Sequence, residues 1–279
     1  MILIVYLLAA VLLVAGQFLG VFAAVIPLMI GTDVMVTAAV YLQFIGIWIV
    51  TIPYLYLTKK NRPILRALGR SPAGNTLGKF LLGLGIGFGL NAVCILGAWL
   101  NRDIALYFSA VEPLPLLFLF VAVFIQSAAE EFLCRGFVYQ RLRQRYRRPA
   151  VAILGNSLLF ALLHLMNDGI TVLSVLNIML TGILFSLMIL YLDSMWCAMA
   201  AHAAWNFTQN IIFGLPNSGI VVPYSVFHLD AASARDSFAY NVGFGVEGTL
   251  LADAVLLFAC AGLWAWGRKY GKASENILP

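Results

Sequence analysis

Residues 113–137 read PLPLLFLFVAVFIQSAAEEFLCRGF, and this stretch decides the fold. Leu114 to Ala129 contain almost no polar residue, yet Glu130, Glu131 and Arg135 follow directly. A membrane-spanning α-helix needs about 20 mostly apolar residues, so the stretch predicts a span with three ionisable side chains at one end. Each ionised group would cost roughly 2.5–3.5 kcal/mol if it faced lipid deep in the bilayer, so these groups must face protein or water.

The composition of the whole chain extends this prediction. Its 279 residues are 62% hydrophobic and 10% charged, with a mean hydropathy of +0.95. Soluble domains are about half apolar and about a quarter charged. Apolar runs extend from Ile2 to Trp266 with no soluble block between them, so we expect one integral membrane domain over residues 1–279. The first run lacks the basic region of a signal peptide, which indicates a retained span.

Eight apolar segments predict an all-α fold: a polytopic membrane helical bundle with about eight transmembrane helices and no sheet. They cover residues 2–30, 35–57, 80–100, 113–138, 150–165, 171–192, 195–213 and 247–267. The connection 214–245 is rich in Gly, Ser and Pro, and such composition is typical of a loop. We expect a plain outward loop there, with a lid or a half-buried re-entrant piece as the alternatives.

The distribution of charge orients these helices. The net charge is +5, and 14 of the 17 Lys and Arg residues fall in three clusters, at 59–79, 141–148 and 268–272. Alternating spans place all three clusters on the side of the N-terminus, and the positive-inside rule makes that side cytoplasmic. We therefore expect a multi-pass protein of a bacterial or archaeal cell membrane with both termini in the cytoplasm. The same rule explains the basic charge without a nucleic acid partner.

Two further patterns predict packing rather than chemistry. The four cysteines lie inside apolar runs without a CxxC pair, and we expect small core residues. They are Cys94, Cys134, Cys197 and Cys260. The alternating glycines of residues 82–90 lack the spacing of a nucleotide loop. They form two small-residue pairs that would let helices approach closely, Gly83 with Gly87 and Gly85 with Gly89.

The polar residues inside the apolar helices recur at a spacing of four. Glu131 and Arg135 lie on one helical face with the acid first, which predicts an ion pair. Glu130 points about 100° away and lacks that partner, so it is free for proton transfer. His202 and Asn206 share a face in the same way, as do Phe160 and His164.

A lone intramembrane histidine is about as often a helix–helix hydrogen bond as a functional group. Two histidines and two glutamates in separate spans instead favour a functional site, because ionisable groups inside the membrane are expensive to retain.

The three motifs, Glu130-Glu131-x-x-x-Arg135, Phe160-x-x-x-His164 and His202-x-x-x-Asn206, resemble those of the CPBP intramembrane proteases. That family includes the eukaryotic CAAX prenyl endoprotease. The resemblance covers residues 113–213, which would form the catalytic core. It implies an intramembrane endopeptidase that acts on a membrane-associated protein or peptide in the lipid bilayer.

The resemblance also implies a role for each motif residue. Glu130, helped by His164, would deprotonate the water that attacks the scissile carbonyl. His202 and Asn206 would donate hydrogen bonds to the oxyanion, while Glu131, Arg135 and Phe160 would support the site. No cofactor is implied. Two glutamates and two histidines could alternatively bind Zn²⁺, although an asparagine suits an oxyanion better than a metal.

Two other functions use the same buried carboxylates. A proton-linked transporter would need them as a relay, but it should show paired halves or broken helices, and the chain has no internal repeat. A catalytically silent scaffold or immunity protein would tolerate the loss of Glu130.

The depth of the site raises a geometric question. Counted from the cytoplasmic ends of the predicted spans, Glu130 and His164 differ by roughly 9 Å. Either the fourth span continues past Phe137 or the fifth span tilts. From the place of Glu130 near the inner end of its span, we expect a cavity that opens toward the cytoplasmic half.

Overall fold

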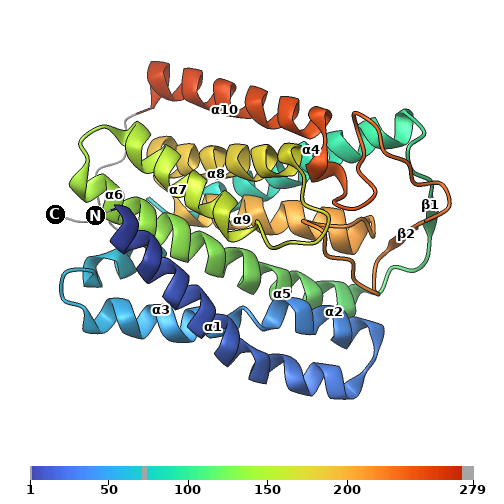
Figure 1. The fold of residues 1–279 in the computed structure, drawn as a ribbon, viewed down its shortest axis with the longest axis horizontal. Helices are drawn as coiled ribbons and strands as arrows, with labels where there is room; N and C mark the ends of the chain where they lie inside the picture. Colours follow the sequence, from blue (N-terminus) through green and yellow to red (C-terminus); the bar gives the residue numbers. More distant parts are fainter. Residues whose placement is uncertain (1, 71–73, 272–279) are drawn as a thin grey trace.

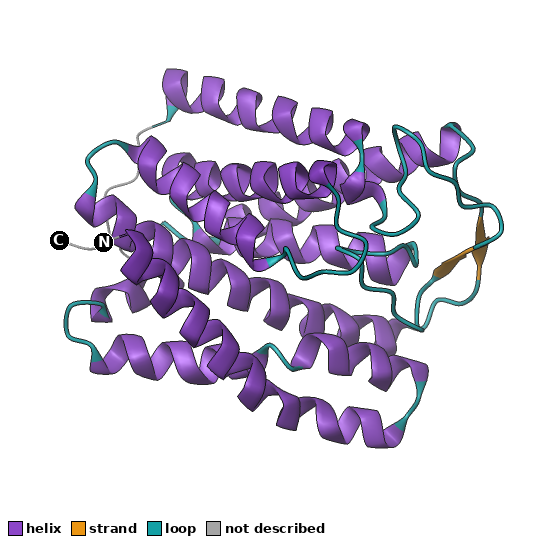
Figure 2. Cartoon of the chain, in the orientation of Figure 1, coloured by secondary structure: helices purple, strands orange, loops and turns teal. Residues whose placement is uncertain are grey.

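The computed structural model describes residues 2–70 and 74–271 as a bundle of helices (Figure 1 and Figure 2). The α-helices are α1 (Ile2–Ile30), α2 (Asp33–Leu42), α3 (Ile45–Leu57), α4 (Leu77–Leu100), α5 (Pro113–Glu131), α6 (Tyr139–Arg145), α7 (Pro149–Leu163), α8 (Val172–Leu192), α9 (Met195–Asn206) and α10 (Leu250–Tyr270). Short 3-10 segments are η1 (Arg62–Leu68) and η4 (Val246–Gly248), and π-helical segments are η2 (Phe132–Val138) and η3 (Phe207–Ile212).

Within the described residues, six helical segments are long and apolar enough to cross a membrane. They are Ile2–Ile30, Asp33–Leu57, Leu77–Leu100, Pro113–Arg145, Val172–Leu192 and Leu250–Tyr270. The predicted all-α membrane bundle is confirmed, and the chain is an integral membrane protein.

The other two predicted spans, 150–165 and 195–213, are helical but shorter than the rest. Helix α7 has 15 residues, and α9 has 12 before η3 continues it. Every residue of α9 from Cys197 to Asn206 is buried. Helices α4, α5 and α8 pack around α9, so it lies within the protein and its length need not match the bilayer.

The prediction that the chain has no sheet is wrong in one place. Strands β1 (Leu106–Phe108) and β2 (Phe227–Leu229) pair antiparallel in a two-stranded sheet at the right-hand end of Figure 2. Both strands lie in connections between helices. Each strand has only three residues, which is too few for an alternating apolar and polar pattern to indicate a strand.

The segment predicted as a plain loop, residues 214–245, is also more ordered than expected. Together with residues 246–249 it forms what we call the outer cap (residues 214–249). Leu215, Tyr240 and Phe244 in this cap have no solvent exposure. Apolar and aromatic side chains recur between its glycines and prolines, so the segment packs on the bundle instead of extending into solvent.

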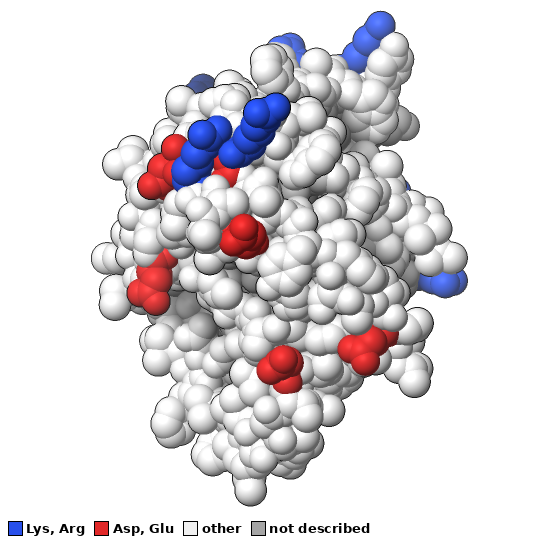
Figure 3. Space-filling view, turned by 90° about the vertical axis from the view of Figure 1, so that its right-hand side faces the viewer, with Lys and Arg blue, Asp and Glu red and all other residues white. Residues whose placement is uncertain are grey.

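The three basic clusters lie at one end of the bundle. The start of α1, the end of α3, the turn from α6 to α7 and the end of α10 are all at the left of Figure 1. Strands β1 and β2 are at the right, and Figure 3 shows that this opposite end is mostly uncharged, with scattered acidic groups and a few basic ones. Lys272 of the third cluster lies outside the described residues. The charge asymmetry that the positive-inside rule requires is therefore present.

Small residues bring α4 against α9, as one of the two predicted glycine pairs requires. A Cβ added at Gly83 or Gly87 would collide with a backbone carbonyl of α9. Gly85 and Gly89 face open space, with nothing within 4 Å of an added Cβ. The second pair therefore has no packing role within the structure. The four cysteines are free and buried, as expected.

Replacing Gly87 with alanine should destabilise the protein, whereas Gly89→Ala should not. The first substitution forces a methyl group into a backbone carbonyl, and overpacking of this kind costs about 1–3 kcal/mol. The second adds a methyl group in open space on the same helix and should change stability by about 0.5 kcal/mol or less. Thermal unfolding of both variants in detergent checks this, and equal melting temperatures would contradict the close contact between α4 and α9.

Candidate active site

The helical rod from α5 through η2 to α6 sets the depth of the site. It runs without a break over 33 residues, from Pro113 to Arg145. Glu130 therefore lies about 15 residues, or about 22 Å, from the basic end of the rod. His164 lies at a similar distance from Pro149, where α7 begins at the same end. The fourth span does continue past Phe137, and this removes the predicted difference in depth.

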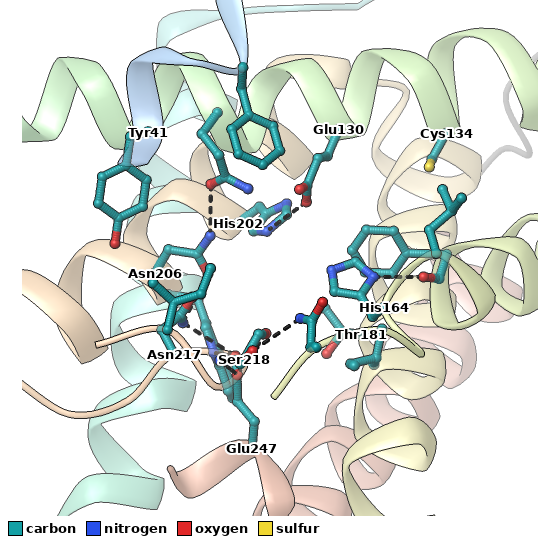
Figure 4. A pocket seen from close by; sticks show the side chains of 18 of the residues that line it. Tyr41, Glu130, Cys134, His164, Thr181, His202, Asn206, Asn217, Ser218 and Glu247 are labelled. Atoms are coloured by element: carbon teal, nitrogen blue, oxygen red, sulfur yellow. Dashed lines mark hydrogen bonds and ion pairs between the residues drawn. The ribbon is translucent and has the colours of Figure 1, made fainter. Parts of the chain in front are cut away.

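Glu130, His164, His202 and Asn206 line one cavity of about 270 Å³. Figure 4 shows these four side chains around the cavity, from α5, the end of α7 and α9. Phe160 lines it as well. The far wall includes residues 217, 218, 220 and 247 of the outer cap. The cavity therefore lies between the middle of the rod and the outer cap, farther from the basic end of the bundle than the place of Glu130 near the inner end of its predicted span suggested.

The predicted ion pair lies beside this cavity and is sealed from it. Arg135 Nη1 is 2.8 Å from Glu131 Oε1, and neither side chain is exposed. The Arg135 guanidinium lies over the ring of Phe160, 4.4 Å from its centroid. The Asn156 carboxamide is oriented so that its nitrogen donates to the carbonyl oxygen of Cys134. Its oxygen then accepts from Arg135 Nε at 3.3 Å. Phe160 and Asn156 thus hold the arginine from the side of α7.

His202 connects the two glutamates. Its Nδ1 is 3.0 Å from Glu131 Oε1, and its Nε2 is 3.8 Å from Glu130 Oε2. An ionised carboxylate only accepts hydrogen bonds, so the hydrogen of His202 belongs on Nδ1. The ring stacks on Phe185, with 5.4 Å between centroids. Nε2 is therefore the nitrogen that remains for chemistry beside Glu130.

The backbone fixes the position of the hydrogen on His164, as Glu131 does for His202. Its Nδ1 lies 2.7 Å from the carbonyl oxygen of Phe160. A carbonyl oxygen can only accept, so Nδ1 carries the hydrogen and the neutral ring keeps its lone pair on Nε2. This ring lines the cavity directly after the last residue of α7. It can accept a proton there.

Asn206 forms hydrogen bonds within the protein through both its amide nitrogen and its amide oxygen. Its Nδ2 donates to Gln126 Oε1 at 3.1 Å and to Ser127 Oγ at 3.3 Å. Its Oδ1 accepts from Asn217 Nδ2 at 3.2 Å. The amide nitrogen of Asn206 therefore faces two acceptors inside the protein.

The part of the chain that forms this site matches a known family. Residues 112–208 match the Type II CAAX prenyl endopeptidase Rce1-like family. The matched region contains all three motifs, so the resemblance drawn from the motifs is confirmed. The match supports a protease that works in a membrane. No curated protein and no solved structure matches the chain.

A buried glutamate outside the Rce1-like region was missed by the sequence reasoning. Glu247 in η4 accepts from Trp205 Nε1 at 2.7 Å and from Ser218 Oγ at 2.9 Å. Asn217 Nδ2 lies 3.4 Å from the same carboxylate. Burial raises the pKa of Glu247, while the hydrogen bonds from Ser218 and Trp205 act in the opposite direction. An acid at the start of the last apolar run was the available signal.

The Zn²⁺ alternative needs several metal-binding side chains close together. Across residues 2–70 and 74–271, no three His, Cys, Asp or Glu side chains form a group that could hold one. Glu131 is already occupied by Arg135 and His202, which removes one of the four ligands of the Zn²⁺ alternative.

Glu131→Ala should lower the stability of the Rce1-like region by about 3–5 kcal/mol, because it leaves the fully buried Arg135 without its counter-charge. Thermal unfolding and the folded yield in detergent measure this loss. Asp33→Ala is the matched control, since Asp33 is exposed in the first turn of α2 and should matter little. A Glu131→Ala variant that is as stable as the control would show that the ion pair has no structural role.

Proposed function

We propose that the protein is an intramembrane endopeptidase in which Glu130 activates water for attack on a peptide bond. The observation that carries this proposal is that Glu130, His164, His202 and Asn206 line one cavity inside a membrane bundle. The Rce1-like match supports the protease class. The substrate would be a membrane-associated protein or peptide, since the cavity lies among membrane-spanning helices.

The two adjacent glutamates have different surroundings, which suits different roles. The Glu131 side chain has no exposure and is paired with Arg135, whereas the Glu130 side chain is 14% exposed and lines the cavity. Water can therefore reach Glu130 and not Glu131. A general base must contact the proton that it removes, so Glu130 is the base and Glu131 is a fixed counter-charge.

The reaction follows from these positions. Glu130 accepts a proton from water while the water oxygen bonds to the scissile carbonyl carbon, and His164 Nε2 accepts a hydrogen bond that orients this water. Negative charge develops on the carbonyl oxygen, where donors stabilise it. The carbon–nitrogen bond then breaks as Glu130 returns its proton to the leaving nitrogen. His202 contributes a donor at Nε2 when its ring is protonated, and Glu131 balances that charge.

Glu130→Gln should abolish cleavage without unfolding the protein, because it keeps the shape of the side chain and removes the base. Comparative proteomics of cells that carry either form should find membrane-protein fragments only with the wild type. The exposed Glu112→Gln is the control and should behave as the wild type. Cleavage should persist in the presence of a metal chelator.

Two results would count against this mechanism. Equal fragment patterns for the wild type and Glu130→Gln would leave the scaffold or the transporter as the better explanation. Loss of cleavage with a chelator, restored by added Zn²⁺, would replace the metal-free reaction by a metal-dependent one.

We further propose that both termini and the three basic clusters are cytoplasmic, as in a bacterial or archaeal cell membrane. The support is the collection of the three basic clusters at one end of the bundle, because the positive-inside rule counts Lys and Arg. Arg145→Cys should react with a membrane-impermeant thiol reagent only after the cells are opened, whereas Asp230→Cys should react in intact cells. The native cysteines are buried and provide a low background. Labelling of position 145 in intact cells would reverse the orientation.

A further inference from the structure

The carboxamide side chains around the cavity are almost all engaged as donors. Gln17 lies on an exposed face of α1. The amide nitrogens that have acceptors within the protein are those of Gln43, Asn167, Asn177, Asn206 and Asn217. Among the described residues, this leaves Gln126 as the buried carboxamide that lines the cavity and whose Nε2 has no protein acceptor.

The orientation of Gln126 is fixed by its oxygen. Gln126 Oε1 accepts from Asn206 Nδ2 at 3.1 Å and from Ser127 Oγ at 3.0 Å. A rotation of the carboxamide by 180° would bring its NH₂ group against the NH₂ group of Asn206, which leaves two donors facing each other. Gln126 Nε2 therefore points away from Asn206, on the side of the carboxamide that is left for the cavity.

The direction of these hydrogen bonds, from donor to acceptor, is set by Glu247 in the outer cap. Asn217 Nδ2 lies within reach of Glu247 Oε1 and also donates to Asn206 Oδ1. Asn206 Nδ2 in turn donates to Gln126 Oε1. Asn217 directs its nitrogen at both Glu247 and Asn206, and Asn206 then accepts on its oxygen and donates from its nitrogen, so the carboxylate at one end leaves a donor at the other. That free donor is Gln126 Nε2.

We propose that Gln126 Nε2 donates a hydrogen bond to the developing oxyanion of the scissile carbonyl, and that Glu247 acts as a positioning residue through Asn217 and Asn206. This inference rests on the proposed endopeptidase function. Gln126 precedes Glu130 by four residues, so their Cβ atoms lie about 5–6 Å apart on one face of α5. A carbonyl group held beside the water on Glu130 is then within reach of the Gln126 donor.

Asn206 acquires a different role in this arrangement. Its amide nitrogen faces two acceptors in the protein, Gln126 Oε1 and Ser127 Oγ. Holding Gln126 is the role that its contacts support. Asn206 then acts on the reaction through Gln126 and is a positioning residue.

Three variants separate the donor from its anchor. Gln126→Glu keeps an oxygen for Asn206 and Ser127 and replaces the donor by an acceptor. Gln126→Met removes both. Ser127→Ala is the matched control, since it removes one hydrogen bond to Gln126 Oε1 and keeps the donor. Asn217→Ala interrupts the connection to Glu247 without touching α5.

The readout is the rate at which Glu130-dependent peptide fragments appear in cells that carry each variant, measured by mass spectrometry at equal amounts of folded protein. The negative charge added by Gln126→Glu can change the pH at which Glu130 becomes active. Rates are therefore compared at the pH at which each variant is fastest. Both Gln126 variants should be slower by about 10²–10³-fold, the loss expected for one oxyanion donor. Ser127→Ala should lose less than about 10-fold, and Asn217→Ala should fall between the two, because each weakens an anchor and leaves the donor in place.

The outcomes distinguish the inference from the function on which it rests. Near wild-type rates for Gln126→Glu, with Gln126→Met impaired, would show that only the anchor matters and would overturn the donor role. If Gln126→Met fails to fold, Gln126→Glu alone decides. Fragments that appear with the wild type and not with Glu130→Gln retain the endopeptidase whatever Gln126 does. The absence of such fragments would overturn the proposed function and this inference together.

Discussion

The fully buried pair of Glu131 and Arg135 is the interaction on which the site depends. Two charges without solvent exposure are tolerated only where they neutralise each other and where further groups satisfy them. Phe160 and Asn156 from α7 and His202 from α9 supply those further contacts. The pair therefore joins three elements that are far apart in the chain. It also fixes the His202 ring beside Glu130, so a structural requirement and a chemical one meet in the same atoms.

The outer cap holds the site from the other side of the cavity. It brings Glu247, Asn217 and Ser218 to the ends of α5 and α9, and Trp205 connects it to α9. The site is thus held from two directions, by a sealed ion pair on one side and by a run of oriented amides on the other. Both are built from groups that a lipid environment would otherwise penalise, and each penalty is offset by the contacts of its neighbours.

Local spacing in the sequence was sufficient for much of this. The four-residue repeat of Glu131 with Arg135 identified the ion pair beside the cavity, and that of His202 with Asn206 identified the face of α9 that lines it. Gln126 and Glu247 could not be found in this way, because their roles depend on the direction of hydrogen bonds between residues about 30 to 80 positions apart. The alternating glycines illustrate the same limit. The spacing of the glycines predicted two packing pairs without a preference. Only the position of α9 shows that Gly83 and Gly87 form the contact.

The two π-helical segments carry a consequence for comparing this chain with others. Segment η2 begins directly after Glu131, and η3 begins directly after Asn206. A π turn holds one residue more than an α turn, so the helix beyond it is rotated by about 100° from its uninterrupted course. An alignment that carries α-helical periodicity through Phe132–Val138 will assign the faces of α6 one position out of register. Relatives that differ by one residue between Arg135 and Val138 would keep the motif and turn a different side of α6 toward its neighbours.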